Sequence, residues 1–336
     1  MRSCEPVSTS SDLFSWRALR KAEQQPEIVL NLCRVRAWQS MSAANTLGEL
    51  ASSLYRQEPK ENLFHYTSLD GVVGIREAGG IWATKIQYFS DYSELDHAFD
   101  MFRSRCQILL GNGRGPREIV LQLDSWLRSR SHTASASLFV VCFTESRDSL
   151  SQWRGYTPMG RGACLEIKAE HLIECANAQG FELAKCIYSY NQKAALVEQA
   201  IDFLVSEAGQ IGPDSSHGTQ SYHPAFASLQ DELFRVAATF KHESFEDERE
   251  WRAVLRLHNS RFAPSIAYRV GRTTLIPYVD FSLKRPSTGE FELWNLWVGP
   301  TAEIDLSVAA LRSLFGRQIR CGRYPVMPSR APYRET

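Results

Sequence analysis

Two glutamates lie close together in the segment FEDEREWRAVL, which covers residues 245–255. In an extended chain Glu248, Glu250 and Arg252 share one face. Paired carboxylates can bind sugar hydroxyls, deprotonate an attacking group or stabilise an oxocarbenium-like transition state. An exposed, salt-bridged edge strand would show the same pattern. The opposite face holds side chains that can pack on a core: Trp251, Ala253 and Leu255.

A second group of polar side chains lies in LFHYTS, residues 63–68. Alternation places His65 and Thr67 on one face of a strand, where they would meet a cleft or water, and Phe64 and Tyr66 on the other. A histidine at a strand end can orient a ribose hydroxyl or carry a proton. The alternative is a surface histidine bonded to a neighbouring carbonyl.

The segment YFSDYSE, residues 88–94, adds aromatic and acidic side chains. Tyr88 or Tyr92 can stack on a flat ring, or can belong to the core. Asp91 and Glu94 are explained by a capping box that begins a helix. A different interpretation of these acids is a metal-dependent hydrolase or nuclease, which would need oxygen and imidazole ligands on one ion. Its ligands would be Asp91, Glu94, Asp96 and His97 with Glu248 or Glu250.

Arginines that can hold phosphate in a bidentate manner lie in two segments. Arg269 and Arg272 belong to YRVGRTTLIPY, and Arg154 and Arg161 surround the loop QWRGYTPMGRG. Each is also explained as a solvated surface charge. The only glycine-rich turn of note, GNGRGP, has neither the spacing nor the lysine of a nucleotide-binding loop. This excludes the usual ATPase and dehydrogenase designs.

The elements that position these residues follow from alternation, apolar runs and capping signals. Strands are predicted at 63–67, 81–86, 137–144, 163–167, 186–190, 250–257, 275–283 and 293–298. Helices are predicted at 69–78, 91–110, 118–129, 194–208, 225–239 and 306–315, with weaker ones at 30–38 and 47–55. The strands outnumber strand–helix–strand alternations. This favours an α+β fold, with helices packed on sheets, over a doubly wound one.

The composition indicates a folded protein with no charge bias. Lysine plus arginine and aspartate plus glutamate number 38 each, so the total charge favours neither nucleic acid nor an acidic membrane. The eight cysteines include no CxxC and no zinc-finger spacing, which is typical of a reducing cytoplasm. The first residues lack the apolar core of a signal peptide, and no apolar run approaches the ~20 residues that span a bilayer. We expect a cytoplasmic protein without membrane contact.

The chain divides, on this reading, into a helical N-terminal extension, residues 1–60, and an α+β domain, residues 61–336. Between two predicted helices, Gly209–Pro224 has the composition of a mobile loop or lid. A protein partner would bind through the extension or through this loop.

Eight ordered segments together resemble a family found mostly in bacteria, domain of unknown function family 2971 (DUF2971). The resemblance spans about Asn62 to Arg334 and departs from the family at Ser90, where an Asn is usual. The segments are LFHYTS, IWATKIQYFSDYSE, FVVCFTESRDSLSQWRGY, GACLEI, KHESFEDEREWRAVL, LIPYVDFSL, WVGP and SRAPYR.

A weaker resemblance is to the ADP-ribosyltransferase superfamily, which cleaves NAD in a cleft between split mixed β-sheets. The resemblance implies that His65 binds the adenosine-side ribose, with Thr67 supporting it and Tyr66 beside it, and that Tyr88 or Tyr92 stacks on nicotinamide. Glu250 would hold the nicotinamide ribose, Glu248 would engage the acceptor, and Arg269 and Arg272 would contact NAD. The middle motif departs from the superfamily's usual Ser-Thr-Ser or paired tyrosines.

These resemblances imply an NAD-dependent ADP-ribosyltransferase or NAD glycohydrolase, acting as a bacterial toxin or anti-phage defence effector. NAD would be the substrate, with no metal, and the macromolecular acceptor is unknown. Two alternatives stay open: the metal-dependent hydrolase or nuclease, and a non-enzymatic module that binds a nucleotide or a protein. The placement of His65 and Glu250 separates them, because an NAD-cleaving site requires both to border one pocket.

Overall fold

The computed structural model describes residues 44–89, 92–129, 138–157, 161–216, 218, 220–257, 265–316 and 326–331, the side chains of 92–94 excepted. The predicted α+β class is confirmed. The strands in chain order are β1 (Leu63–Ser68), β2 (Gly80–Lys85), β3 (Leu138–Thr144), β4 (Gly162–Ile167), β5 (Glu182–Lys185), β6 (Glu250–Arg256), β7 (Ala267–Val270), β8 (Leu275–Ser282), β9 (Asn295–Val298) and β10 (Val326–Pro328).

Seven of the eight predicted strands are confirmed to within two residues at each end. The strand predicted at 186–190 is wrong. The observed strand, β5, ends at Lys185, Ile187 makes a single backbone bridge to Phe240, and a helix begins at Tyr190. The strands that the sequence did not predict are short: β5 and β7 have 4 residues and β10 has 3, too few for alternation to be recognised.

The strands hydrogen-bond into one mixed sheet and not into two separate ones, which corrects the predicted split sheets. The strand order is β10-β9-β4-β1-β3-β2-β8-β7. Strand β6 pairs with β3, and β5 pairs with β6. The strand pairs are antiparallel except β9 with β10, which run parallel.

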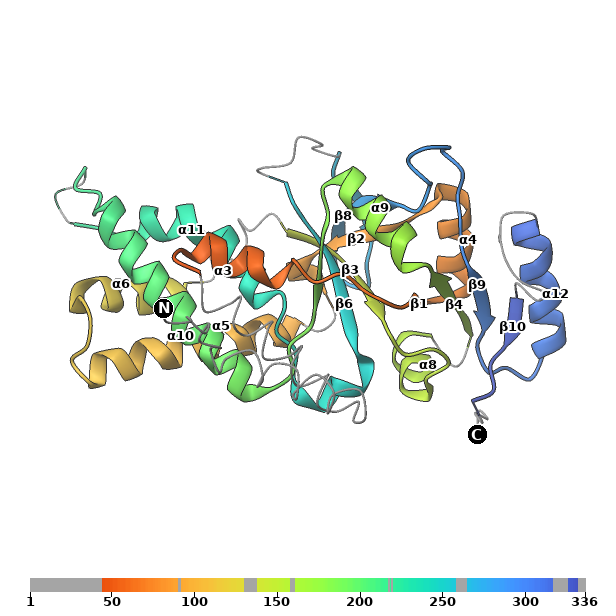
Figure 1. Ribbon diagram of the computed structural model, residues 1–336, viewed down its shortest axis with the longest axis horizontal. Coiled ribbons are helices and arrows are strands. Elements are labelled where there is room, and N and C mark those ends of the chain that lie inside the picture. Colours follow the sequence, from red (N-terminus) through yellow and green to blue (C-terminus); the bar gives the residue numbers. More distant parts are fainter. Residues whose placement is uncertain are drawn as a thin grey trace, which may run out of the picture. The chain divides into compact units, whose positions relative to one another are not determined.

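The sheet nevertheless forks at β3. Strand β6 pairs with every residue of β3 along one edge. On the opposite edge β2 pairs with Phe139 and Val140, whereas β1 pairs with Thr144. None of the described strands pairs with Val141–Phe143 on that edge. Strands β1 and β2 therefore diverge, as their paths in Figure 1 show, and the middle of β3 is left without a strand partner on this edge.

Helix α4 (Leu69–Ala78), which joins the two arms of the fork, has the predicted bounds. The Ser68 hydroxyl accepts a hydrogen bond from the Gly71 N–H at 3.1 Å and caps the first turn. The helix ends at Gly79, whose φ of 73° is in the left-handed region that glycine adopts most easily. The capping signals in the sequence thus fix both ends of the connection.

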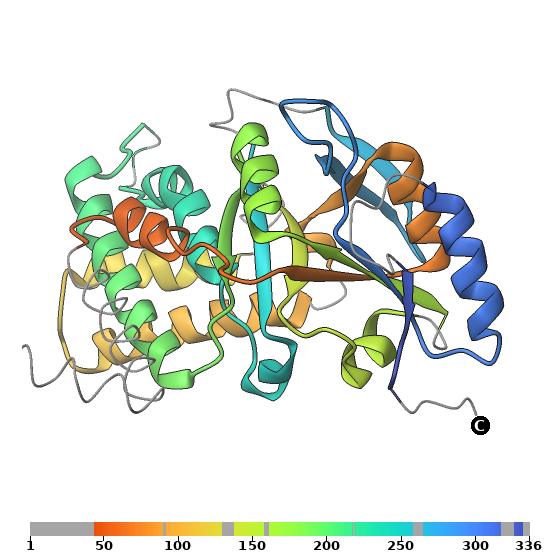
Figure 2. The same cartoon turned by 45° about the vertical axis from the view of Figure 1, so that its right-hand side comes forward.

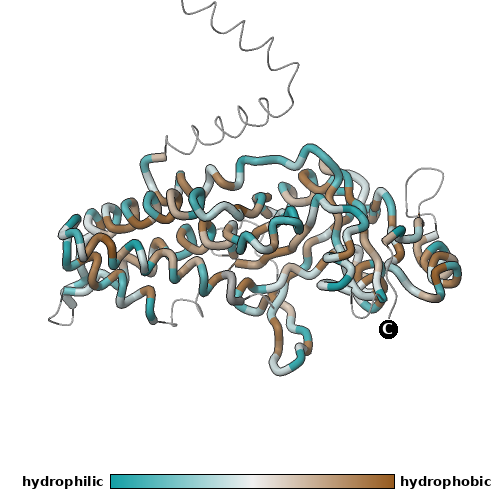
Figure 3. The backbone as a smooth tube through the Cα atoms, turned by 90° about the horizontal axis from the view of Figure 1, so that it is seen from below, coloured by the Kyte–Doolittle hydropathy of each residue, from teal (hydrophilic) through white to brown (hydrophobic). Residues whose placement is uncertain are grey.

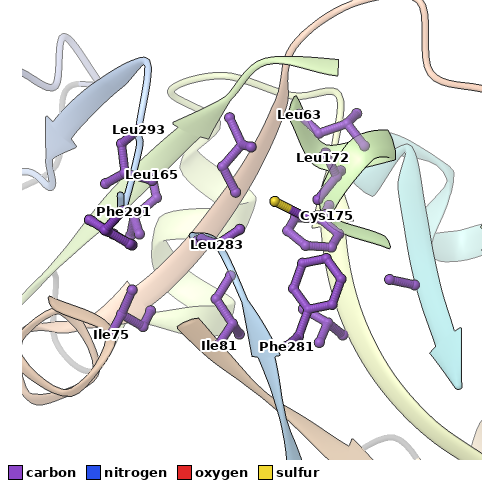
Figure 4. Close-up of a cluster of buried hydrophobic side chains, with 14 of the residues drawn as sticks. Leu63, Ile75, Ile81, Leu165, Leu172, Cys175, Phe281, Leu283, Phe291 and Leu293 are labelled. Carbon is purple, nitrogen blue, oxygen red and sulfur yellow. The ribbon is translucent and has the colours of Figure 1, made fainter. Parts of the chain in front are cut away.

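The main core lies between the sheet and the helices α4, α9 and α12. It contains side chains from most strands, with Val72 and Ile75 of α4, Leu172 and Cys175 of α9, and Phe315 of α12. Figure 4 shows part of this cluster between the strands. The bounds of the two further helices are α9 (Ala169–Gln179), which was not predicted, and α12 (Ile304–Phe315).

The other long helices pack mainly on one another, beyond one end of β3 and β6 (Figures 1 and 2). Figure 3 shows hydrophobic and hydrophilic residues alternating along them, as expected of helices with one buried face. No helix in the described ranges is both long and apolar enough to cross a membrane. These helices are α3 (Leu47–Leu54), α5 (Tyr92–Gly111), α6 (Arg117–Arg128), α10 (Tyr190–Ile211) and α11 (His223–Ala237).

Helix α3 belongs to the same compact unit as the sheet, which spans Thr46–Thr336. The Leu47 N–H donates to Glu207 Oε1 at 2.6 Å, and the Tyr55 hydroxyl donates to the Arg235 carbonyl at 2.9 Å. The unit therefore begins earlier than the predicted boundary at residue 61. The predicted helix at 30–38 lies outside the described residues.

Gly162 of β4 gives a test of the packing beside the fork. A Cβ atom there would lie 2.3 Å from the Thr67 carbonyl oxygen and 2.5 Å from Thr157 Cγ2. Because both contacts are far inside van der Waals distance, Gly162→Ala should lower the free energy of unfolding by about 2 kcal/mol. Urea denaturation measures this. Gly74→Ala in α4 is the control, since nothing lies within 4 Å of its Cβ position, and equal stability of the two variants would contradict the prediction.

Candidate functional site

A cavity of about 760 Å³ opens at the fork. Its walls come from strands far apart in the sequence: His65 from β1, Trp82 from β2, Cys142 from β3, Glu250 from β6 and Arg269 from β7. The size is in the range of pockets that hold small ligands and cofactors. The imidazole and the acid that the sequence singled out therefore border one pocket.

His65 closes the unpaired edge of β3. Its Nδ1 lies 2.9 Å from the carbonyl oxygen of Cys142, which is in the stretch that has no strand partner on this side. A carbonyl only accepts hydrogen bonds, so Nδ1 carries the proton and Nε2 is an acceptor. Burial lowers the pKa of His65 and outweighs the opposing effect of this hydrogen bond. The imidazole is therefore neutral at neutral pH.

Tyr66 and Thr67, the two residues that follow His65 in β1, have other roles. The cavity is not lined by Thr67, whose hydroxyl lies over Gly71 in the first turn of α4. Tyr66 does line the cavity, but its hydroxyl donates to the Ser146 carbonyl at 2.9 Å and accepts from the Ser149 N–H at 3.0 Å. The structure thus places Tyr66 as an anchor for the loop after β3 and does not bring Thr67 to His65 or to the pocket.

The two predicted carboxylates share one lysine. Lys241 Nζ lies 2.7 Å from Glu248 Oε2 and 2.5 Å from Glu250 Oε2. Arg252 Nε lies 2.8 Å from the other oxygen of Glu250, and the Tyr156 hydroxyl donates to Glu248 Oε2 at 3.0 Å. All five side chains line the cavity. The cluster contains two negative and two positive groups, so its formal charge is zero.

Glu248 and Glu250 do not share a strand face as predicted. Glu248 is the last residue of a 3-10 helix, η3 (Glu243–Glu248), and β6 begins only at Glu250. Between them Arg249 has a φ of 43°, a left-handed conformation that reverses the chain locally. The Thr144 hydroxyl donates to the Glu248 carbonyl and fixes this turn on the end of β3. The carboxylates meet through the turn and through Lys241. The predicted alignment of Arg252 with Glu250 is confirmed.

The electrostatics of the cluster keep Glu250 ionised. Burial raises the pKa of its carboxyl, but the charges of Arg252 and Lys241 and the hydrogen bonds from Arg252 and Cys142 lower it more, to about 2. Burial and the Glu250 charge in turn raise the pKa of the Cys142 thiol well above its ordinary value. The thiol therefore stays protonated and acts as a hydrogen-bond donor to Glu250, not as a nucleophile.

The other end of the cavity is basic and aromatic. Arg269 Nη2 lies 3.4 Å from Thr84 Oγ1, and the guanidinium is 5.8 Å from the centre of the Trp82 ring. Arg272 and Tyr88 also line this cavity, and Tyr88 is 39% exposed. The side chain of Tyr92 lies outside the described residues. Three of the four predicted ligand contacts in this region are therefore placed at the pocket.

The remaining predicted positions lie elsewhere. Neither Arg154 nor Arg161 is among the cavity-lining residues, and neither is any described residue of Gly209–Pro224. The predicted loop is shorter than expected, because α10 extends to Ile211 and α11 begins at His223. In the described part of the chain no three His, Cys, Asp or Glu side chains are grouped so that they could hold a metal ion. Asp91 and the side chain of Glu94, which the metal alternative requires, are outside that part.

Sequence reasoning missed the residues that connect the two halves of the site. Lys241 lies nine residues before Glu250, in KHESFEDEREWRAVL. The sequence does not show how the chain turns between them, so it does not predict their contact. Trp82 and Cys142 lie within predicted strands, and nothing in the sequence singles them out as site residues. A lysine just before a run of acids was the one available signal, whereas Trp82 and Cys142 are recognisable only once the fork is known.

Residues 152–253 match the model of a family described as a protein of unknown function, DUF2971. The matched part includes the whole acid cluster, from Tyr156 to Arg252, but not His65. This supports the family resemblance over these residues, fewer than the sequence suggested. No curated protein and no solved structure matches the chain, so the likeness to ADP-ribosyltransferases stays a prediction.

The low pKa of Glu250 makes stability depend on pH. A carboxyl whose pKa falls from 4.5 to about 2 on folding contributes stability above pH 4.5, which is lost as the pH falls towards 2. The difference in unfolding free energy between wild type and Glu250→Gln should therefore shrink by about 2 kcal/mol between pH 5 and pH 3. Urea denaturation at each pH measures it, and a difference that is constant with pH would refute the charge assignment.

Proposed function

We propose that the cavity at the fork binds NAD and cleaves the bond between nicotinamide and ribose, as in an ADP-ribosyltransferase or an NAD glycohydrolase. The observation that carries this proposal is that His65 and Glu250, 185 positions apart by residue number, border one cavity of about 760 Å³. A pocket formed where two arms of a sheet diverge also resembles the cleft of that superfamily. The volume suits a ligand larger than a single nucleoside.

The reaction needs little chemistry from the protein. The C1′–N bond breaks with its electron pair going to nicotinamide, which leaves as a neutral base. The ribose C1′ then bonds to an oxygen or nitrogen of the acceptor, and the acceptor loses a proton. A positioned ribose and a carboxylate near the developing positive charge account for most of the catalysis in such a step.

The chain offers a group for each of these tasks. His65 lines the cavity, and its Nε2 atom is an acceptor that suits a ribose hydroxyl. Glu250 is ionised and lines the wall, where its charge can stabilise an oxocarbenium-like ribose. The Glu248 side chain is 15% exposed against 5% for Glu250, so Glu248 is the carboxylate that an acceptor would reach first.

The full compensation of the acids favours a second candidate function. Lys241 and Arg252 neutralise Glu248 and Glu250, so the pair offers less net negative charge to a cationic transition state than free carboxylates would. A module that binds a nucleotide without cleaving it would need no free carboxylate. The measured rate of NAD cleavage separates the two candidates.

If the acceptor is water, turnover would deplete free NAD. We propose that such NAD depletion would be the basis of a role as a bacterial toxin or anti-phage effector. If the acceptor is a macromolecule, cleavage should accelerate when cell lysate is added.

The test is incubation of the purified protein with NAD, with and without lysate, and quantification of released nicotinamide. Glu248→Gln should slow transfer to an acceptor by about 100-fold, in line with the usual contribution of one general base. Glu246→Gln is the matched control, because Glu246 is an exposed acid of the same 3-10 helix and does not line the cavity. Absence of nicotinamide release by wild type, with calorimetric binding of NAD, would establish the binding module instead.

Glu250→Gln should abolish NAD cleavage, and the structure indicates that it should also destabilise the fold. The substitution withdraws a negative charge from between two buried cations, and breaking a buried pair costs about 3–5 kcal/mol. The cleavage rate of the variant is therefore measured below its own unfolding temperature, which circular dichroism determines. A folded Glu250→Gln protein that releases nicotinamide at the wild-type rate would remove Glu250 from the mechanism.

A further inference from the structure

The two ends of the cavity differ in charge. At one end Glu248 and Glu250 are matched by Lys241 and Arg252. At the other end Arg269 and Arg272 line the wall, and no carboxylate of the described residues lies within ion-pair distance of either. Among the described residues that line the cavity, the uncompensated charge is therefore positive, and it is confined to the end formed by β2, β7 and β8.

The guanidinium of Arg269 has hydrogen-bond donors that a ligand could satisfy. Its Nε is buried and makes no hydrogen bond within the described part of the chain, while Nη2 has only a long contact, 3.4 Å, to Thr84 Oγ1. Burying an N–H donor without an acceptor is unfavourable. Nε and Nη2 lie on the same edge of a guanidinium, and such a pair of donors is the one with which arginine binds phosphate.

Trp82 provides a flat surface beside these arginines. The indole lines the cavity and is 45% exposed, whereas its strand neighbours Ile81 and Ala83 are buried in the core. The ring of Tyr278 lies 4.7 Å away at an angle of 34° and supports the indole from one side. A large aromatic side chain held open in a pocket is a stacking platform for a planar ring such as a nucleobase.

The registers of the sheet set the order of these groups along β3. Thr84, next to the arginine end, pairs with Val140, His65 bonds to the carbonyl of Cys142, and Glu250 pairs with Thr144. Four residues of strand separate the first of these positions from the last, or about 13 Å. Trp82 comes two residues before Thr84 in β2, which runs antiparallel to β3, so Trp82 is level with about Cys142. Arg269 lies beyond Thr84 on the side away from Glu250. Trp82 and Arg269 are therefore both on the Val140 side of the acid.

We propose that Trp82, Arg269 and Arg272 form the subsite for the adenosine diphosphate half of the ligand. The adenine stacks on Trp82 and the pyrophosphate binds the two arginines. This orientation, which rests on the proposed function, places the nicotinamide riboside at the acid end beside Glu250. The binding of ADP itself requires no bond cleavage, so the subsite can be tested separately from the reaction.

The experiment is calorimetric titration of the purified protein with ADP. Wild type should bind it, and Trp82→Ala should weaken binding by about 5- to 150-fold, the range for loss of one base–aromatic stack. Trp82→Phe should retain most of the affinity. Tyr268→Ala is the matched control: Tyr268 is 63% exposed on β7, next to Arg269 in the chain, but does not line the cavity. If Trp82→Ala binds ADP as wild type does, the adenine assignment is overturned.

The phosphate assignment has its own variants. Arg269→Gln and Arg272→Gln should each weaken ADP binding by about 10-fold or more, as expected for a lost charged hydrogen bond. Arg114→Gln, at an exposed loop arginine that does not line the cavity, should have no effect. Unchanged affinity in both pocket variants would overturn the phosphate assignment.

Nicotinamide mononucleotide tests the orientation. Its affinity should be unaffected by Trp82→Ala, and a loss equal to or greater than that for ADP would show that the ligand lies the other way round. ADP binding that depends on Trp82, without NAD cleavage, would uphold this subsite and refute the proposed reaction. If wild type cleaves NAD and Trp82→Ala leaves ADP binding unchanged, the proposed reaction is upheld and this subsite is refuted.

Discussion

The hydrogen bonding of β3 is the constraint on which the rest of the structure depends. Strand β6 occupies one edge completely, while the other edge is shared by β2 at one end and β1 at the other. A strand segment in between is left without a partner among the described strands, and an exposed backbone carbonyl there must find a donor. The His65 imidazole supplies it at Cys142. One gap in a ladder thus creates the cavity and also determines the tautomer of the histidine that lines it.

The charges around this gap are arranged in two different ways. The acids of η3 and β6 form ion pairs with Lys241 and Arg252, and these pairs explain how the buried carboxylate of Glu250 can remain ionised with little access to water. The arginines of the β7–β8 hairpin have no such partners among the described residues. One end of the cavity can therefore bind an anion, and the other end is a prearranged, neutral cluster. The ligand proposed above has separate phosphate and sugar portions, and these would meet the two ends.

Local signals in the sequence predicted most of the fold and part of the site. Ser68 and Gly79 determine both ends of α4, and alternation placed Trp251, Ala253 and Leu255 in the core. The turn at Arg249, the position of Lys241 between two carboxylates and the joining of the expected separate sheets through β3 were not predictable, because they depend on contacts between distant segments. Trp82 has the same local pattern as a buried strand aromatic. Only the divergence of β1 from β2 leaves it open.

The pairing of β3 with β6 also has a consequence for how the protein acquires its site. The hydroxyl of Thr144 and the carbonyl of Glu248 that it binds are 104 residues apart in the chain, and β4, β5 and several helices lie between these positions. Closing so long a loop is entropically expensive and slow compared with forming a helix or a hairpin. An emerging polypeptide that has not yet reached residue 256 lacks one entire wall of the cavity. The site is consequently a late product of folding, absent from every shorter nascent chain.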